Sequence, residues 1–373
     1  MKMGGIKILH VLDTLSVDSG VARMVINYIL HAQSSGLSMD IAVHKTAKLS
    51  LEKEIISCGS AVYHLPDITL SQISQYRTEF RHLLQQNHYH VVHGHIPNAA
   101  FLYLTEAKRE NVPLRIQHSH NSEGADLHWK RIRNRLLASR IPIWANCFVA
   151  CSEKAATYLF PKTNLTDIHI IPNAIDTQTF FFNADVRQRI RKRLAIEDNI
   201  LCIGHVGRFM RQKNHKFVLE AFSVLHKINP NSKLLLVGNG PLQDTIRAHV
   251  KSLGIANSVL LLDQQESLVE YYQAFDVFWL PSYYEGFPIV GIEAQSMGLP
   301  CLFSNSITPM AQILPSCTFL PIGNPLLWAE TSIDCSNNYL RQDTSFLIAE
   351  AGFDARSHAK KVADLYRNQL IAN

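Results

Sequence analysis

Residues 276–303 read DVFWLPSYYEGFPIVGIEAQSMGLPCLF and contain the signals of a strand, a loop, a helix and a second strand. Residues 276–280 are apolar and aromatic, which predicts a buried strand of a parallel sheet. Pro288 suits the first position of a helix, and Gly298 before Pro300 is a usual stop. Residues 300–303 form the next expected strand. The stretch therefore predicts an α/β fold with a parallel sheet.

One carboxylate lies in the loop of this stretch and another in its helix. Glu285 belongs to the expected loop, and Glu293 follows about a turn and a half into the helix. Loops at the carboxyl ends of parallel strands form ligand crevices, and a helix N-terminus favours an anion. A carboxylate beside an anion binds hydroxyl donors such as ribose or a sugar. A phosphorylated sugar is the ligand indicated. The structural alternative is that Glu285 caps the helix and Glu293 is solvated.

The spacing of Glu285 and Glu293 resembles the Glu-x7-Glu signature of the family 4 retaining glycosyltransferases. The resemblance implies that Glu285 contacts the donor sugar and that Glu293 holds the ribose of the nucleotide. The connecting residues expected to line the same site are Gly286, Phe287, Pro288 and Ile289. The resemblance covers most of the chain and implies the GT-B fold, with two Rossmann-like βαβ domains that face a cleft.

The length of 373 residues also favours two domains over one. We expect an acceptor-binding domain over residues 1–185 and a nucleotide-sugar-binding domain over residues 186–355. A segment resembling the end of the family's first domain, residues 168–176, precedes this boundary. In GT-B proteins the last helix crosses back to the first domain, and residues 356–373 are the candidate.

A second group of candidate residues follows the strand expected at residues 201–206. Gly207 permits a close turn, and Arg208 and Lys213 place two cations at the carboxyl end of that strand, where they suit a diphosphate. The resemblance implies the same role for this Arg and Lys. Gly238, after the strand at residues 233–237, is expected on the nucleotide side of the crevice.

The first half of the chain offers weaker candidates. Gly20 opens a helix where relatives carry a pair of glycines, so the resemblance is partial there. Family enzymes place a His against the donor sugar, and both His118 and His120 compete for that role, with His120 favoured. His93 and His95 could bind a metal, but no third ligand is nearby in the sequence, so we expect them to be packed or hydrogen-bonded.

A basic helix is expected over residues 128–140, which include Lys130, Arg131, Arg133 and Arg135 and no acid. It is either a solvated face or a surface that adsorbs to an anionic membrane carrying a lipid-linked acceptor. The net charge of +5 gives no indication of a nucleic-acid partner. The seven cysteines lack a Cys-x-x-Cys pair, which argues against a zinc site. A strand is expected directly after residues 1–5, so we expect a cytoplasmic protein. If it adsorbs to a membrane, we expect it at the inner face.

These observations predict a transferase that acts without a metal or cofactor, because neither Asp-x-Asp nor a metal cluster is evident. The expected donor is a UDP- or GDP-linked sugar, the acceptor is a saccharide or a lipid-linked saccharide, and the product is a surface polysaccharide or glycolipid. In this scheme Arg208, Lys213, Glu285 and His120 are the catalytic candidates. A nucleotide-sugar epimerase and a catalytically silent nucleotide-sugar-binding protein remain as alternatives.

Overall fold

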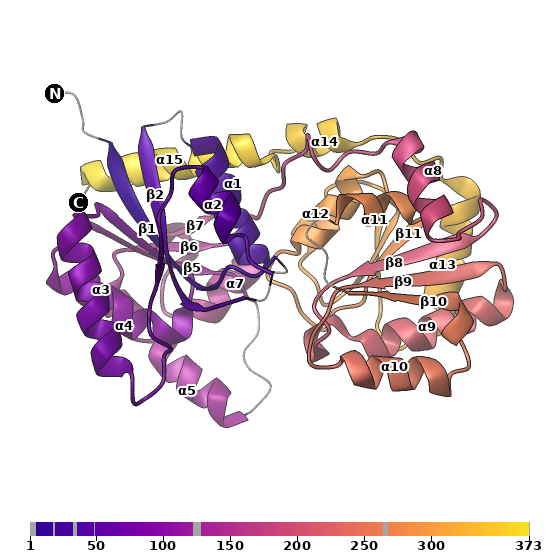
Figure 1. Ribbon diagram of the computed structural model, residues 1–373, viewed down its shortest axis with the longest axis horizontal. Helices are drawn as coiled ribbons and strands as arrows, with labels where there is room; N and C mark the ends of the chain where they lie inside the picture. Colours follow the sequence, from indigo (N-terminus) through magenta and orange to yellow (C-terminus); the bar gives the residue numbers. More distant parts are fainter. Residues whose placement is uncertain are drawn as a thin grey trace. The chain divides into compact units, whose positions relative to one another are not determined.

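The computed structural model describes residues 5–17, 19–32, 36–47, 49–121, 128–263 and 268–372. The chain forms two compact units (Figure 1). The first unit contains Met1–Ala174 and Ala355–Asn373, and the second contains Ile175–Asp354. From the sequence we expect the first division near residue 185, whereas here it follows Ala174. The reason is that residues 175–183 bond within the second unit; for example, Ser296 Oγ donates a hydrogen bond to the Phe180 carbonyl at 2.5 Å.

A seven-stranded parallel sheet forms the centre of the first unit, in the order β3-β2-β1-β4-β5-β6-β7 (Figure 1). Its strands are β1 (Ile6–Thr14), β2 (Leu37–Lys45), β3 (Val62–His64), β4 (Val91–Gly94), β5 (Leu114–Ser119), β6 (Cys147–Ala150) and β7 (Ile168–Ile170). The central strands are almost entirely buried, since the helices of a parallel βα fold cover both faces of the sheet.

The helices of the first unit follow the strands in alternation, as expected for βα units. They are α1 (Gly20–Ala32), α2 (Glu52–Ser57), α3 (Ile73–Asn87), α4 (Ala100–Arg109), α5 (His128–Ala138), α6 (Ile141–Trp144), α7 (Glu153–Leu159) and the C-terminal α15 (Ala355–Ala372). The last helix packs on α1, so the end of the chain returns to the first unit. Short 3₁₀ helices lie at Pro97–Ala99 and Leu165–Asp167.

The second unit contains a six-stranded parallel sheet in the order β10-β9-β8-β11-β12-β13. Its strands are β8 (Leu201–Val206), β9 (Ser232–Val237), β10 (Val259–Leu262), β11 (Val277–Leu280), β12 (Cys301–Ser304) and β13 (Cys317–Leu320). Leu234 and Leu236 belong to the core on one face of the sheet and Leu235 to the core on the other. This alternation buries both faces, which explains the continuous apolar runs in the sequence.

The helices of the second unit are α8 (Ala184–Arg193), α9 (His215–Ile228), α10 (Gln243–Ser252), α11 (Val269–Ala274), α12 (Ile289–Ser296), α13 (Pro325–Asn338) and α14 (Ser345–Glu350). Short 3₁₀ helices lie at Arg211–Lys213, Ala256–Ser258 and Pro309–Ala311. The sequence suggests one helical ending over residues 346–370, but α14 and α15 are separate helices. Gly352, with φ at +87°, lies between them and ends α14 in a conformation that favours glycine.

The strand order identifies where each unit can bind a ligand. Numbered within its own unit, the second sheet runs 3-2-1-4-5-6, the order of a dinucleotide-binding Rossmann fold, and the first sheet has the same order with a seventh strand beside the sixth. The order reverses between the first and fourth strands, which are β1 and β4 in the first unit and β8 and β11 in the second. Ligands of open α/β sheets bind outside the carboxyl ends of the strands at this reversal. The expected cation loop follows β8 and the expected carboxylate loop follows β11.

Candidate active site

The loops after β8 and β11 meet through a close ion pair. Lys213 ends the 3₁₀ helix between β8 and α9, and its Nζ lies 2.7 Å from Glu285 Oε1 in the loop before α12. The two side chains are only 14% and 9% exposed, so water screens this pair less than a pair at the surface. Two residues that were singled out separately in the sequence therefore form one charged group.

Gln212 fixes the same two loops to each other. Its Nε2 donates to the Tyr284 carbonyl at 2.9 Å and to Glu285 Oε2 at 3.3 Å. The Tyr283 backbone N–H donates in return to the Gln212 carbonyl at 2.9 Å. Both oxygens of the Glu285 carboxylate are thus bonded by side chains of the β8 loop. The sequence gives no sign of this role for Gln212 beyond its position next to Lys213.

Glycines bring the backbones of the β8 and β9 loops together. A Cβ at Gly238 would lie 2.2 Å from the Gly207 carbonyl oxygen, and Gly238 has φ at +145°, where other residues are strained. A Cβ at Gly207 would lie 3.1 Å from Lys213 Cδ. Both glycines leave the space that the Lys213 stem and the neighbouring backbone occupy. Arg208 follows Gly207 with an exposed side chain, and no ion pair of Arg208 occurs among the described residues.

The entrance of α12 differs from the expectation by one residue. Pro288 is the N-cap residue and the helix begins at Ile289, because the ψ of Pro288 is 108°, outside the helical region. Pro288 itself makes no side-chain capping hydrogen bond, and the Glu285 carboxylate pairs with Lys213 and Gln212. Gly286 connects Glu285 to Phe287, which is buried and stacks on Phe353 at 5.5 Å between ring centroids.

Glu293 is a buried carboxylate of α12 and is only 4% exposed, so the alternative in which it is a solvated helix residue is wrong. Tyr272 Oη of α11 donates a hydrogen bond to Glu293 Oε2 at 2.7 Å. Burial, and next the Glu293 charge, raise the pKa of Tyr272 well above its usual value, so this tyrosine keeps its proton and remains a donor. Tyr272 is a partner that no motif in the sequence reveals.

The two competing histidines of the first unit lie together at the end of β5. His118 is 1% exposed and His120 is half-buried, with their ring centroids 4.0 Å apart. His120 Nε2 lies 2.8 Å from His95 Nδ1, and His118 Nδ1 lies 3.2 Å from His93 Nε2. His120 is the more exposed of the two side chains. Both rings belong to a larger group of histidines.

His93 and His95 are buried and hydrogen-bonded, as expected, but the premise that no third possible metal ligand is nearby is wrong. His10 of β1 joins them, and His95 with His118 and His120 forms a second such group. These ligands come from different strands, which is why no sequence spacing reveals them. Burial lowers the pKa of His10 and of His120 to about 3, and it lowers those of the other three histidines well below the usual value. The group is therefore neutral at neutral pH.

The remaining candidates of the first unit are accounted for more simply. Gly20 is the first residue of α1, where the Ser19 hydroxyl accepts a hydrogen bond from the Ala22 N–H at 3.2 Å. Helix α5 covers the expected basic segment up to Ala138, and Arg133 and Arg135 on it are exposed. The side chains of Lys130 and Arg131 lie outside the described ones. Across the described residues, α-helices with the length and apolarity of a membrane span do not occur.

Comparison with known proteins agrees with this geometry. The family model of the glycosyl transferases group 1 matches residues 186–316, and the model of glycosyltransferase family 4 matches residues 19–179. The putative glycosyltransferase EpsF of Bacillus subtilis is 31% identical over 96% of both chains. A galactosyltransferase of Escherichia coli, named for UDP-Gal and a GlcNAc-diphosphoundecaprenol acceptor, is 29% identical over 60% of this chain and 59% of its own.

Solved structures share the fold at low sequence identity. HepE of Anabaena, in a complex with UDP and glucose, superposes with a TM-score of 0.82 over 97% of this chain and all of its own, at 16% identity. WaaG, a glycosyltransferase of lipopolysaccharide biosynthesis, has a TM-score of 0.69 over 96% of this chain and 99% of its own, at 15% identity. With two Rossmann-like units and a full-length relative above 30% identity, this chain belongs to the family 4 glycosyltransferases of the GT-B fold.

Proposed function

We propose that this glycosyltransferase transfers a sugar, with retention of the anomeric configuration, from a UDP- or GDP-linked donor to a saccharide or lipid-linked acceptor of a surface polysaccharide. One observation carries the proposal: Lys213 and Glu285 form a shielded pair at the ends of neighbouring strands, next to the exposed Arg208. A cation pair suits a diphosphate, and a carboxylate beside it suits sugar hydroxyls.

The chemistry that these residues serve is the departure of a nucleoside diphosphate. The bond between the anomeric carbon and the phosphate oxygen breaks, and its electron pair leaves with the diphosphate. Arg208 and Lys213 stabilise the negative charge that gathers there in the transition state. A diphosphate is a good leaving group, so electrostatic stabilisation is the main requirement. Because Arg208 and Lys213 supply it, the proposed transfer needs no divalent ion at the diphosphate.

The nature of donor and acceptor is supported by relatives. HepE binds UDP and glucose, and the Escherichia coli relative is named for a UDP-linked donor and a lipid diphosphate acceptor. CapH of Staphylococcus aureus, a capsular polysaccharide glycosyltransferase, is 24% identical over 80% of this chain and 81% of its own. An acceptor anchored in a membrane would bring the reaction to the membrane surface, where the exposed basic residues of α5 suit anionic lipids.

Thermal denaturation with a panel of nucleotide sugars tests the donor. A donor present at 100 times its dissociation constant raises the free energy of unfolding by about 2.7 kcal/mol. The stabilising donor is then assayed for release of nucleoside diphosphate with and without saccharide acceptors, in the presence of EDTA or of Mg²⁺. We expect slow hydrolysis that an acceptor accelerates and that Mg²⁺ does not stimulate, and NMR of the product should show the donor's anomeric configuration.

Other outcomes would contradict the proposal. Conversion of the donor into an epimeric sugar nucleotide without acceptor would identify an epimerase. Donor binding without any turnover, across a broad set of acceptors, would identify a binding protein. A requirement for Mg²⁺ or Mn²⁺ would show that the diphosphate is neutralised by a metal ion and not by Arg208 and Lys213 alone.

A further inference from the structure

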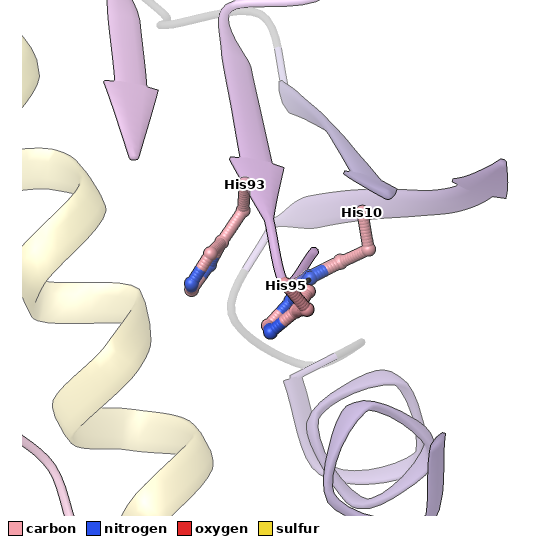
Figure 2. A group of neighbouring side chains, drawn as sticks. All are labelled: His10, His93 and His95. Atoms are coloured by element: carbon pink, nitrogen blue, oxygen red, sulfur yellow. Dashed lines mark hydrogen bonds between the residues drawn. The ribbon is translucent and has the colours of Figure 1, made fainter. Parts of the chain in front are cut away.

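Three buried histidines lie on one face of the first unit's sheet. His10 on β1 is paired in register with His93 on β4, the neighbouring strand, and His95 follows β4 two residues later. Because side chains alternate along a strand, His93 and His95 point to the same side as His10. Figure 2 shows the His10 ring directed at His95, with the His93 ring beside them. Two adjacent strands thus bring three imidazoles into one space.

The distances between the ring nitrogens suit a common ligand. His10 Nδ1 lies 3.0 Å from His95 Nε2, and one ring nitrogen from each of the three residues lies within 4.8 Å of the others. Nitrogens that bind one tetrahedral zinc ion at about 2.05 Å lie about 3.3 Å apart. The observed range brackets that spacing, so small rotations of the side chains would complete a binding site.

The three imidazoles are shielded from water, with exposed fractions of 0%, 1% and 7%. An imidazole binds a metal ion through the lone pair of one ring nitrogen. A set made only of imidazoles favours zinc, cobalt, nickel or copper over magnesium or calcium.

Hydrogen bonding within the histidine group leaves some ring nitrogens without a partner inside the group. The chain His10–His95–His120 has three rings and two contacts, so one nitrogen at each end has no partner within it. In agreement, the buried Nε2 of His10, Nδ1 of His120 and Nε2 of His118 have no hydrogen-bond partner among the described residues. A buried polar atom without a partner is costly, and of these three atoms Nε2 of His10 is the one that belongs to a proposed ligand.

The outer nitrogens of the proposed ligands are held by further groups. His93 Nδ1 lies 2.7 Å from Tyr366 Oη of α15, and His95 Nδ1 lies 2.8 Å from His120 Nε2. Metal-binding histidines commonly bond through their second nitrogen in this way, which fixes the ring orientation. His118 Nδ1, 3.2 Å from His93 Nε2, lies close enough to complete the coordination that three ligands leave open.

We propose that His10, His93 and His95 bind one transition-metal ion, of the zinc or cobalt class, which joins β1 to β4 in the first unit. The site stabilises the fold of the first unit, whereas Arg208 and Lys213, the proposed ligands of the diphosphate, belong to the second unit. This inference stands independently of the proposed transfer reaction, because its test needs no donor and no acceptor.

The test uses tag-free full-length protein that has been stripped with EDTA and warmed overnight with Zn²⁺ or Co²⁺. We expect about one equivalent of tightly bound metal by mass spectrometry of the dialysed protein, and intense visible absorption from tetrahedral Co²⁺. We also expect a rise in melting temperature of about 5 °C at 100 times the dissociation constant. Less than about a tenth of an equivalent in the wild type would overturn the proposal.

Variants locate the ion. His10→Gln and His93→Gln should each lower the metal affinity at least tenfold, whereas the exposed His64→Gln and the neighbouring His120→Gln should leave the stoichiometry unchanged. Loss of binding in His120→Gln with full binding in His10→Gln would overturn the assignment in favour of the second histidine group. If the His10 and His93 variants do not fold, an anomalous diffraction peak at the zinc edge decides: a peak between these three rings supports the proposal, and a peak elsewhere overturns it.

Discussion

The Lys213–Glu285 pair positions the Lys213 ammonium group and leaves it able to bind a further ligand. An ammonium group has three donors, and the hydrogen bond to Glu285 occupies one of them. The others remain able to meet a phosphate oxygen. Since Glu285 also accepts from Gln212, the pair is fixed from both loops, so the Lys213 side chain is positioned before a ligand arrives. Such preorganisation is what makes a fixed charge effective in catalysis.

Removing either cation should therefore reduce transfer strongly. We expect Arg208→Ala and Lys213→Ala each to lower kcat/KM about a hundredfold, because one donor to the developing charge is worth about 3 kcal/mol. Lys216→Ala is the matched control, since Lys216 is 75% exposed and its pair with Glu220 on α9 contributes little. Circular dichroism should show all three variants folded. Near-normal turnover of both Arg208→Ala and Lys213→Ala would refute their role at the diphosphate.

Substitution of the two carboxylates should weaken the binding of different parts of the donor. Glu285→Ala should weaken the intact nucleotide sugar and leave free nucleoside diphosphate nearly unaffected, whereas Glu293→Ala should weaken both. Titration calorimetry with each ligand measures the difference. Glu293→Ala also removes the shorter of the two hydrogen bonds of the buried Tyr272 hydroxyl, which keeps the Val290 carbonyl at 3.3 Å, at a cost of about 1 kcal/mol in unfolding free energy. The double variant Glu293→Ala with Tyr272→Phe removes that cost, so a remaining loss of affinity belongs to the ligand contact. Equal effects of both single variants on both ligands would contradict the assignment.

At the scale of elements, the sequence predicts strands and strand ends well because both leave local signals. Continuous apolar runs mark β8, β9 and β11, and the loops that follow β8 and β11 carry Lys213 and Glu285, which neighbouring parallel strands bring together. Partners supplied by other elements leave no such signal. Tyr272 reaches Glu293 from α11, and His10 reaches His93 from β1. The first residue of a helix is also hard to predict at a proline, because proline fits both the N-cap and the first helical position, and Pro288 is the N-cap here.

A buried histidine of β8 makes stability depend on pH. Burial lowers the pKa of His205 to about 4, although its Nδ1 bonds to the Trp279 carbonyl at 2.9 Å. Between pH 6.5 and 4 the unfolded state binds a proton that the folded state does not, so stability falls as the pH falls through this window. The slope is about 1.4 kcal/mol per pH unit for this residue.

The variant His205→Gln isolates this contribution. It keeps a side-chain donor for the Trp279 carbonyl but cannot titrate, so urea unfolding between pH 6.5 and 4 should show a shallower decline by about that slope. Equal slopes for wild type and His205→Gln would show that this histidine is not held neutral.

At the scale of the whole molecule, the two units share one strand order. Each unit places its first and fourth strands together, although the two sequences share no obvious repeat. The C-terminal helix then returns to the first unit, where Tyr366 bonds to His93 across most of the chain length. The resemblance implies this return. Local sequence alone does not, because the polarity pattern of a helix does not show which unit the helix packs on.

We expect α5 to draw the enzyme to an anionic membrane. Arg133 and Arg135 are exposed on this helix, and Lys130 and Arg131 precede them in a stretch without acids. Each basic residue near such a surface contributes about 1 kcal/mol, so four give measurable but reversible adsorption. The attraction is screened beyond about 10 Å at 0.1 M salt, and binding should therefore weaken as salt is added.

The measurement is sedimentation with vesicles of anionic and of neutral lipids. Replacing Lys130, Arg131, Arg133 and Arg135 by Gln should reduce binding to the anionic vesicles and leave donor hydrolysis unchanged, because the proposed diphosphate ligands belong to the second unit. A control with the same change in charge replaces the exposed Arg189, Lys192, Lys360 and Lys361 by Gln on α8 and α15. If adsorption depends on the position of the charges, this control binds like the wild type. Equal losses in both variants would show that only net charge matters, and no loss in either would leave α5 as a solvated face.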